Sequence, residues 1–126
     1  MRKKMKEMTK RIVEREGLNI DVNRKVMELS GGQQQLSSIL RIFIFSPKIV
    51  LLDEPTASLS ASASAKMIER FKGMKEKVSM IYVSHKLPEV ISVSDRIVVL
   101  RRGEVAGEIE SKKATPLVLL QKIIGK

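Results

Sequence analysis

Short apolar runs alternate with longer amphipathic stretches along this chain of 126 residues. The longer stretches carry apolar residues at helical spacing, whereas the short runs have the length and the β-branched content of strands. Gly17 and the pair Ser46-Pro47 mark the ends of the first two stretches. The pattern predicts helices over 3–16, 30–45, 61–77, 87–93 and 115–124, strands over 49–52, 79–83, 96–100 and 105–109, and an irregular connection over 18–28.

The order of these elements indicates an α/β fold. Strands that alternate with helices are typical of a mainly parallel sheet, because a parallel connection must cross back over the sheet. Residues 49–52 are apolar without polar alternation, which predicts a strand buried on both faces. The last two strands are the exception, since Arg101-Arg102-Gly103 between them predicts a hairpin turn.

Composition narrows the classes of function. The chain is 43% hydrophobic, 30% charged and 3% aromatic, and it has no cysteine. These values predict one small globular domain without disulfides, thiolate metal sites or platforms for base stacking. No apolar run has the length of a membrane span or the position of a signal peptide, so we expect a cytoplasmic protein. We interpret the net charge of +10 as solvated helix faces near a membrane, and a basic nucleic-acid-binding protein is the remote alternative.

The first candidate site is the turn Leu-Ser-Gly-Gly-Gln at residues 29–33, where a helix is predicted to begin. Ser30 can cap that helix, and the two glycines allow an anion to approach the unpaired backbone N–H groups. A helix N-terminus of this kind suits a phosphate group. The same residues also make an ordinary helix start, and the turn alone leaves both interpretations open.

The second candidate site is the acidic pair Asp53 and Glu54, directly after the strand over 49–52. Open α/β sheets bind ligands at the carboxyl ends of their strands, where neighbouring carboxylates favour a cation. We therefore expect Asp53 to bind Mg²⁺ and Glu54 to orient and polarise a water. His85 follows the next strand and is expected at the same edge. Taken alone, the two acids also fit a solvated turn at the end of a strand.

Taken in order, these segments resemble the ATP-binding subunits of ABC transporters. The matching segments are 29–35 for the signature motif, 47–56 for the Walker B strand, Ser84-His85 for the switch histidine, and 95–103 for the strand and hairpin that follow. Within that family, the loop over 56–60 looks most like the sugar-importer ATPases. Residues 1–46 are then expected to form part of the helical signature subdomain, and residues 47–126 the C-terminal part of the ATP-binding core.

The resemblance implies an ATPase that works as a pair, with ATP and Mg²⁺ held between two ATPase domains. It implies three groups of site residues: Ser30, Gly31, Gly32 and Gln33 at the γ-phosphate of ATP held by the partner; Asp53 on Mg²⁺ with Glu54 as general base and His85 at the γ-phosphate; and Ser58, Leu59 and Ser60 in the dimer interface. The implied partners are a second ATPase domain or a missing N-terminal half, together with transmembrane permease subunits at the inner face of the cell membrane.

One part of the family pattern has no counterpart in this sequence, namely the Gly-rich Lys-Ser/Thr loop that cradles ATP phosphates. We therefore expect the C-terminal part of a P-loop NTPase-like ABC ATPase domain, without the strand that leads into that loop. A truncated, split or isolated product of this kind is expected to be inactive alone and to form oligomers. The alternative is a non-catalytic module that pairs with a full-length ATPase subunit and donates only its signature face.

Overall fold

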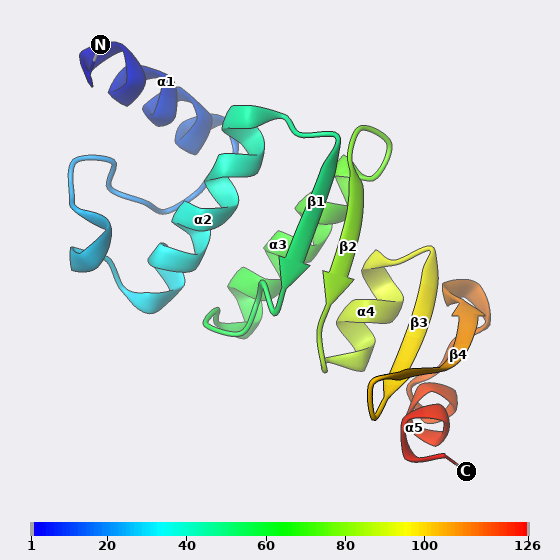
Figure 1. Ribbon diagram of the computed structural model, residues 1–126. Coiled ribbons are helices and arrows are strands. Elements are labelled where there is room, and N and C mark those ends of the chain that lie inside the picture. The colour runs from blue at the N-terminus through cyan, green and yellow to red at the C-terminus, as the bar shows by residue number, and fades with distance from the viewer. Residues whose placement is uncertain (1, 126) are drawn as a thin grey trace.

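The computed structural model describes residues 2–125 and has the α/β organisation that the sequence predicts (Figure 1). The helices are α1 (Arg2–Arg15), α2 (Gly31–Phe45), α3 (Ala61–Met74), α4 (Leu87–Val93) and α5 (Pro116–Ile124), and the strands are β1 (Ile49–Asp53), β2 (Ser79–Val83), β3 (Arg96–Arg101) and β4 (Glu104–Glu110). Each helix and strand predicted from the sequence is present. The largest difference in bounds is in α3, which ends at Met74 because residues 75–77 form a turn.

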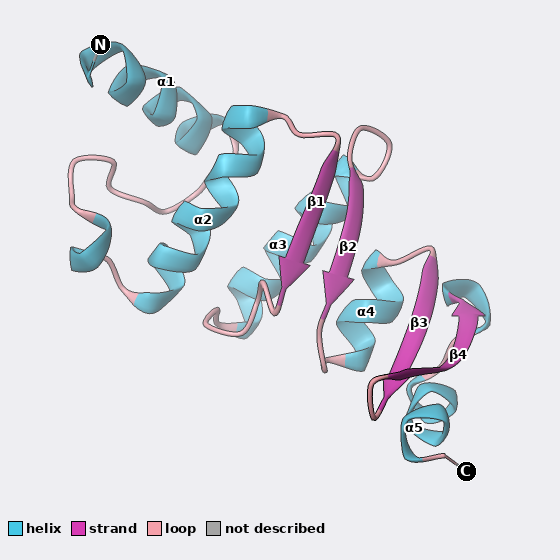
Figure 2. Ribbon diagram, in the orientation of Figure 1, coloured by secondary structure: helices cyan, strands magenta, loops and turns pink. Residues whose placement is uncertain are grey.

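The elements follow one another across the molecule, and the two ends of the chain lie at opposite ends of it (Figure 1). Helices α1 and α2 occupy one end, the pair β1 and β2 lies in the middle with α3 behind it, and β3 and β4 lie beside α5 at the other end. Colouring by secondary structure shows that α4 lies in the region between β2 and β3 (Figure 2).

The strands form two separate pairs. β1 and β2 are parallel, with Ile49 opposite Ser79 and Asp53 opposite Val83, so both strands end at the same edge. β3 and β4 form the predicted antiparallel hairpin, with an irregularity between Val99 and Leu100. Within the described residues, β2 and β3 are not hydrogen-bonded to each other.

Two hydrophobic clusters hold these elements together. The larger cluster surrounds Met67 and Phe71 of α3, both without solvent exposure, and includes residues of α1, α2 and β1. The smaller cluster is centred on Leu119 of α5 and lies under the hairpin. Tyr82 of β2 packs against both clusters, and its ring meets that of Phe71 edge to face at 6.0 Å. The residues at the end of β2 are therefore supported from two sides.

The prediction that residues 49–52 are buried on both faces is wrong. Val50 and Leu52 are buried, but Ile49 and Leu51 are 65% and 74% exposed. The side chains of a strand point alternately to opposite faces, and α3 covers only one face of the β1–β2 pair. The continuous apolar run reflects a strand with a second apolar face that no described element covers.

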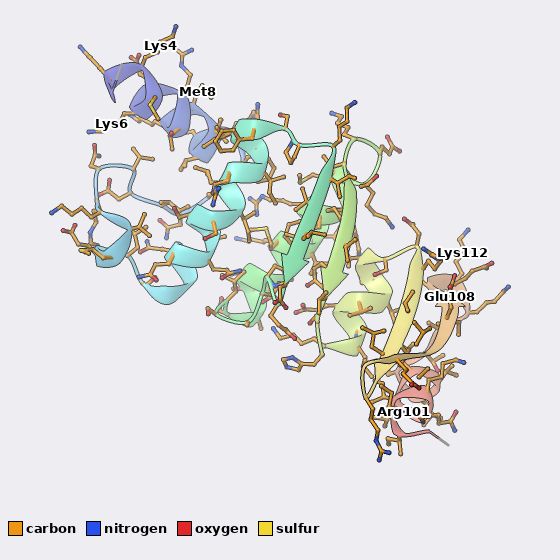
Figure 3. The ribbon with its side chains drawn as sticks, viewed as in Figure 1. Lys4, Lys6, Met8, Arg101, Glu108 and Lys112 are labelled. Carbon is orange, nitrogen blue, oxygen red and sulfur yellow. The ribbon has the colours of Figure 1, made fainter. Side chains whose placement is uncertain are left out.

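The basic side chains labelled in Figure 3 lie at both ends of the molecule. Lys4 and Lys6 project from α1, while Arg101 and Lys112 lie near the hairpin at the opposite end. The charge is thus spread over separate elements. None of the described helices has both the length and the apolar composition needed to span a membrane.

Candidate functional site

The first candidate element is the turn at the start of α2, where Ser30 and Gln33 form a reciprocal cap. The Ser30 hydroxyl accepts from the Gln33 N–H at 3.4 Å, and the Gln33 side-chain oxygen accepts from the Ser30 N–H at 3.2 Å. The first amides of a helix have no acceptor within it, so the N–H groups of Gly31 and Gly32 are not used by the helix itself. The turn thus has the geometry of an anion site on a rigid helix end.

The two glycines of this turn have different surroundings. A Cβ atom added to Gly31 would meet nothing within 4 Å. A Cβ atom added to Gly32 would lie 3.2 Å from the Ser58 carbonyl oxygen and 3.7 Å from Leu59 Cδ2. Gly32 therefore packs tightly against the loop after β1, whereas the space at Gly31 is open.

The residues predicted for the dimer-interface loop all have a contact within the chain. The Ser58 carbonyl lies against Gly32, and Leu59 packs against the larger hydrophobic cluster. Ser60 caps α3 by accepting a hydrogen bond from the Ala63 N–H at 3.3 Å. These contacts fix the shape of the loop and leave Ser58 and Ser60 exposed.

The strongest convergence is at the carboxyl ends of β1 and β2, where Glu54 meets Ser84 and His85. The Glu54 carboxylate accepts from the Ser84 hydroxyl at 3.3 Å and from the His85 backbone N–H at 3.1 Å. It also lies 2.7 Å from His85 Nδ1. The Glu54 N–H donates to the Val83 carbonyl at 2.9 Å, which extends the pairing of the two strands beyond Asp53. The sequence placed these groups at one edge, and they are in direct contact there.

The contact with His85 changes the acidity of Glu54. The hydrogen bond from the His85 side chain is the main cause that lowers the pKa of the Glu54 carboxyl, with smaller contributions from the His85 backbone and Ser84. Glu54 is therefore ionised at neutral pH. Because an ionised carboxylate can only accept hydrogen bonds, His85 must carry a proton on Nδ1 in this arrangement.

Asp53 ends β1 with an exposed side chain. Across residues 2–125, no hydrogen bond or ion pair reaches its carboxylate, and no three His, Cys, Asp or Glu side chains converge as a metal cage would require. Mg²⁺ usually takes one or two carboxylates and completes its shell with waters and substrate phosphates. A single accessible carboxylate at the strand end fits that mode of binding, and it does not fit a site made of protein ligands alone.

A second polar cluster lies beneath this edge, and sequence reasoning missed it. Thr56 is fully buried, and its hydroxyl donates to Glu89 Oε2 at 2.6 Å. The Tyr82 hydroxyl donates to the same oxygen at 2.9 Å, and Lys86 Nζ lies 3.4 Å from the other carboxylate oxygen, Oε1. The spacing of Lys86 and Glu89 on one helical turn was the only local signal. The contacts of Thr56 and Tyr82 with Glu89 come from tertiary structure.

The sequence profile of the ABC transporter family matches residues 1–57 of this chain. The ribose import ATP-binding protein of Caldanaerobacter subterraneus is 36% identical over 104 residues, which are 82% of this chain and 21% of that protein. The xylose/arabinose import ATP-binding protein of Sulfolobus acidocaldarius is 39% identical over 106 residues, 82% of this chain and 42% of that protein. The chain thus spans about a fifth to two fifths of the length of these relatives.

Solved structures with the same fold include ATP-binding cassettes. A bacterial ABC transporter cassette solved as a dimer is 28% identical, with a TM-score of 0.74 over 83% of this chain and 46% of that one. A nucleotide-free ATP-binding cassette from an ABC transporter has a TM-score of 0.71 over 95% of this chain and 46% of the other, and at 22% identity it shows the fold alone.

Proposed function

This chain belongs to the ABC-transporter ATP-binding family, and from that premise we propose that it supplies one face of an ATP-hydrolysing site in a sugar importer. The observation that carries the proposal is the direct contact of Glu54 with Ser84 and His85 at the shared end of β1 and β2. A carboxylate, a hydroxyl and an imidazole at the carboxyl edge of a parallel strand pair lie where α/β folds bind ligands.

The proposed roles follow from what each side chain can do. Glu54 is an ionised acceptor and orients the attacking water as general base. His85 donates from Nδ1 to Glu54, so its Nε2 can donate to a phosphate oxygen only when the ring carries a second proton. Asp53 is the accessible carboxylate for Mg²⁺. Bound Mg-ATP would supply the phosphoryl group and the charge that these residues face.

The turn at the start of α2 serves a different nucleotide in this proposal. Ser30, Gly31, Gly32 and Gln33 form a capped helix N-terminus, which suits the γ-phosphate of ATP held by a partner. Ser58, Leu59 and Ser60 then lie in the interface, since Gly32 packs directly against that loop. The partner is a second ATPase domain or a chain that supplies the phosphate loop, in an assembly attached to permease subunits at the inner face of the membrane.

The sugar class is proposed from the relatives. Ribose, xylose/arabinose and galactose/methyl galactoside are named for import proteins that are 36%, 39% and 40% identical to this chain. The galactose/methyl galactoside protein is from Photobacterium profundum, and the match covers 80% of this chain and 20% of that protein. We propose import of a sugar of this kind and assign no single one.

The test is ATP hydrolysis by this chain combined with a complementary N-terminal ATPase segment. Glu54→Gln is expected to abolish turnover and keep ATP binding, because the amide retains the size of the side chain but cannot accept a proton. His85→Ala is expected to lower turnover by roughly two to three orders of magnitude if His85 stabilises charge at the phosphate. Glu76→Gln, an exposed acid in the turn after α3, is the matched control and should leave the rate unchanged.

Two results would decide against this proposal. Turnover near the wild-type rate in Glu54→Gln would exclude Glu54 as the base. The second result is that a full-length partner hydrolyses ATP only when the turn at Ser30 of this chain is intact, and that Glu54→Gln has no effect on that rate. This result would identify the chain as a non-catalytic module that donates only its signature face.

A further inference from the structure

The buried polar cluster beneath the strand ends connects three parts of the chain. Thr56 comes from the loop after β1, Tyr82 from β2, and Lys86 and Glu89 from the start of α4. Thr56 has no solvent exposure, and the Glu89 side chain is 17% exposed. These contacts join residues that are 33 positions apart in the sequence.

Glu89 is the centre of this cluster. One of its oxygens accepts hydrogen bonds from both Thr56 and Tyr82, and the other faces Lys86 Nζ. Burial alone would raise the pKa of Glu89, but the hydrogen bonds from Thr56 and Tyr82 and the charge of Lys86 outweigh it and hold the pKa below its ordinary value. A partly buried, charged acceptor with two hydroxyl donors is costly to leave unpaired, and this cost favours keeping Thr56 and Tyr82 in place.

Lys86 also binds Thr56. Its Nζ donates to both the Thr56 carbonyl and the Thr56 hydroxyl at 3.2 Å. Thr56 is thus held by a cation and a carboxylate that are one helical turn apart on α4, and the loop after β1 cannot shift relative to α4 without breaking these bonds.

Thr56 and Lys86 lie next to the proposed catalytic pair, Glu54 and His85, in the sequence. Thr56 is two residues after Glu54, and Lys86 directly follows His85. The Glu54–His85 contact is itself open to water, with the His85 side chain 78% exposed. An exposed pair of side chains contributes little by itself, so the Glu54–His85 side-chain contact adds little to the bonds that Glu54 makes with Val83, Ser84 and the His85 backbone. The partly buried cluster is a second connection between the two loops.

We propose that Glu89 is a positioning residue that, through Thr56 and Lys86, keeps the loop of Glu54 in register with the loop of His85. The proposal rests on the proposed function for its catalytic meaning, but the positioning itself is independent of nucleotide. Glu89 touches neither Glu54 nor His85 in the contacts above, and it acts through the backbone of the two loops.

The chain carries one histidine and one tyrosine, which makes the test direct. The ¹⁵N shifts of the His85 ring, recorded at a pH where the imidazole is neutral, report the Nδ1–H tautomer that the Glu54 contact requires. Absorbance of the Tyr82 phenolate reports the buried cluster, because burial and the Glu89 bond raise the pKa of Tyr82 well above its ordinary value. Glu54→Gln and Glu89→Ala are compared with wild type, and Glu76→Ala is the control.

We expect Glu89→Ala to shift the His85 ring toward the Nε2–H tautomer of a free imidazole and to let Tyr82 ionise at lower pH, in a chain that remains folded by circular dichroism. Glu89→Gln, which keeps the acceptor oxygen, should restore most of the His85 signal. If Glu89→Ala does not fold, Lys86→Met decides, because it removes the bonds from Lys86 to Thr56 and should shift the His85 tautomer in the same direction. An unchanged His85 tautomer in folded Glu89→Ala, with Tyr82 released, would overturn the proposal and leave Glu89 a purely structural residue.

The assembled ATPase separates this proposal from the proposed function. If the wild-type assembly hydrolyses ATP, Glu89→Ala should lower kcat by roughly ten- to a hundredfold with little change in KM, as expected for misplaced catalytic groups. A rise in KM with unchanged kcat would overturn the proposal. If the wild-type assembly is inactive, the proposed function fails, and the His85 and Tyr82 readouts still decide the positioning role.

Discussion

The turn after β1 and the turn between β3 and β4 each contain a non-glycine residue with a left-handed backbone, Glu54 (φ 46°) and Arg102 (φ 52°). In the hairpin, Arg102 and Gly103 (φ 82°) are the two central residues, and a type I′ hairpin turn requires positive φ at both. No hairpin turn explains Glu54. Its conformation is held by Val83, Ser84 and His85, about thirty positions away. Strain that is imposed from a distance is typical of functional sites, whereas strain in the hairpin has a local cause.

The largest expected effect comes from the hydrophobic clusters that support the two turns. Phe71→Ala removes the fully buried ring under β2 and should lower the free energy of unfolding by about 3–5 kcal/mol. Leu119→Ala, in the cluster under the hairpin, should cost about 2–5 kcal/mol. Urea unfolding followed by circular dichroism measures both.

The two variants should differ at the site. Phe71→Ala removes the ring that Tyr82 packs on, so the His85 ring signal should change, while Leu119→Ala should leave that signal intact in the folded chain. Equal loss of the His85 signal in both variants would show that the two regions behave as one unit, and the comparison would fail.

The second prediction concerns the facing edges of the two sheets. β2 and β3 each have one described partner, and Ile81, Val83, Val98 and Leu100 are about half exposed or more. Unpaired edges of this kind recruit other chains, so we expect an oligomer at micromolar concentrations. The surface over 42–45 adds less than its sequence suggests, because Ile42 is buried and only Phe45 is strongly exposed.

Sedimentation equilibrium tests this association. Ile81→Lys combined with Val98→Lys should shift the chain toward monomer, since charges on a strand discourage further pairing. Leu117→Lys, at an exposed position of α5, is the matched control. A wild-type chain that stays monomeric throughout the micromolar range would contradict the prediction.

The third prediction compares the two strained residues directly. Arg102→Gly should stabilise the chain by about 1 kcal/mol, because glycine adopts a left-handed backbone without the cost paid by other residues. Glu54→Gly gains a similar relief but loses the bonds to Ser84 and His85, so its stability should stay within about 1 kcal/mol of wild type. A loss of several kcal/mol in Glu54→Gly would show that the Glu54 bonds are structural.

These differences also explain how far the sequence could predict the structure. The starts of α2, α3 and α5 were predictable because Ser30, Ser60 and Thr115 act locally as their N-caps. The hairpin was predictable because Gly103 lies in a short turn between two strand-like runs. The convergence of Glu54 and His85 followed from both residues lying at the ends of consecutive strands. The exposed face of β1 and the Thr56–Glu89 bond depend on which elements meet in space, and no local pattern contains that information.

The smallest expected effect is the pH dependence of the Glu54 contact. Because the folded-state pKa of Glu54 is lowered, its contribution to stability is fully present above the pKa of the unfolded chain, about 4.3, and is lost as the pH falls through the folded value. Both side chains of the pair are partly or largely exposed, so the contribution should be at most about 1 kcal/mol. The difference in unfolding free energy between wild type and Glu54→Gln should therefore shrink as the pH falls below about 4. Glu76→Gln, measured over the same range, should show no such change. A difference that grows between about pH 5 and pH 3 would mean that Glu54 is protonated in the folded chain, and the assignment of an ionised base next to His85 would then be wrong.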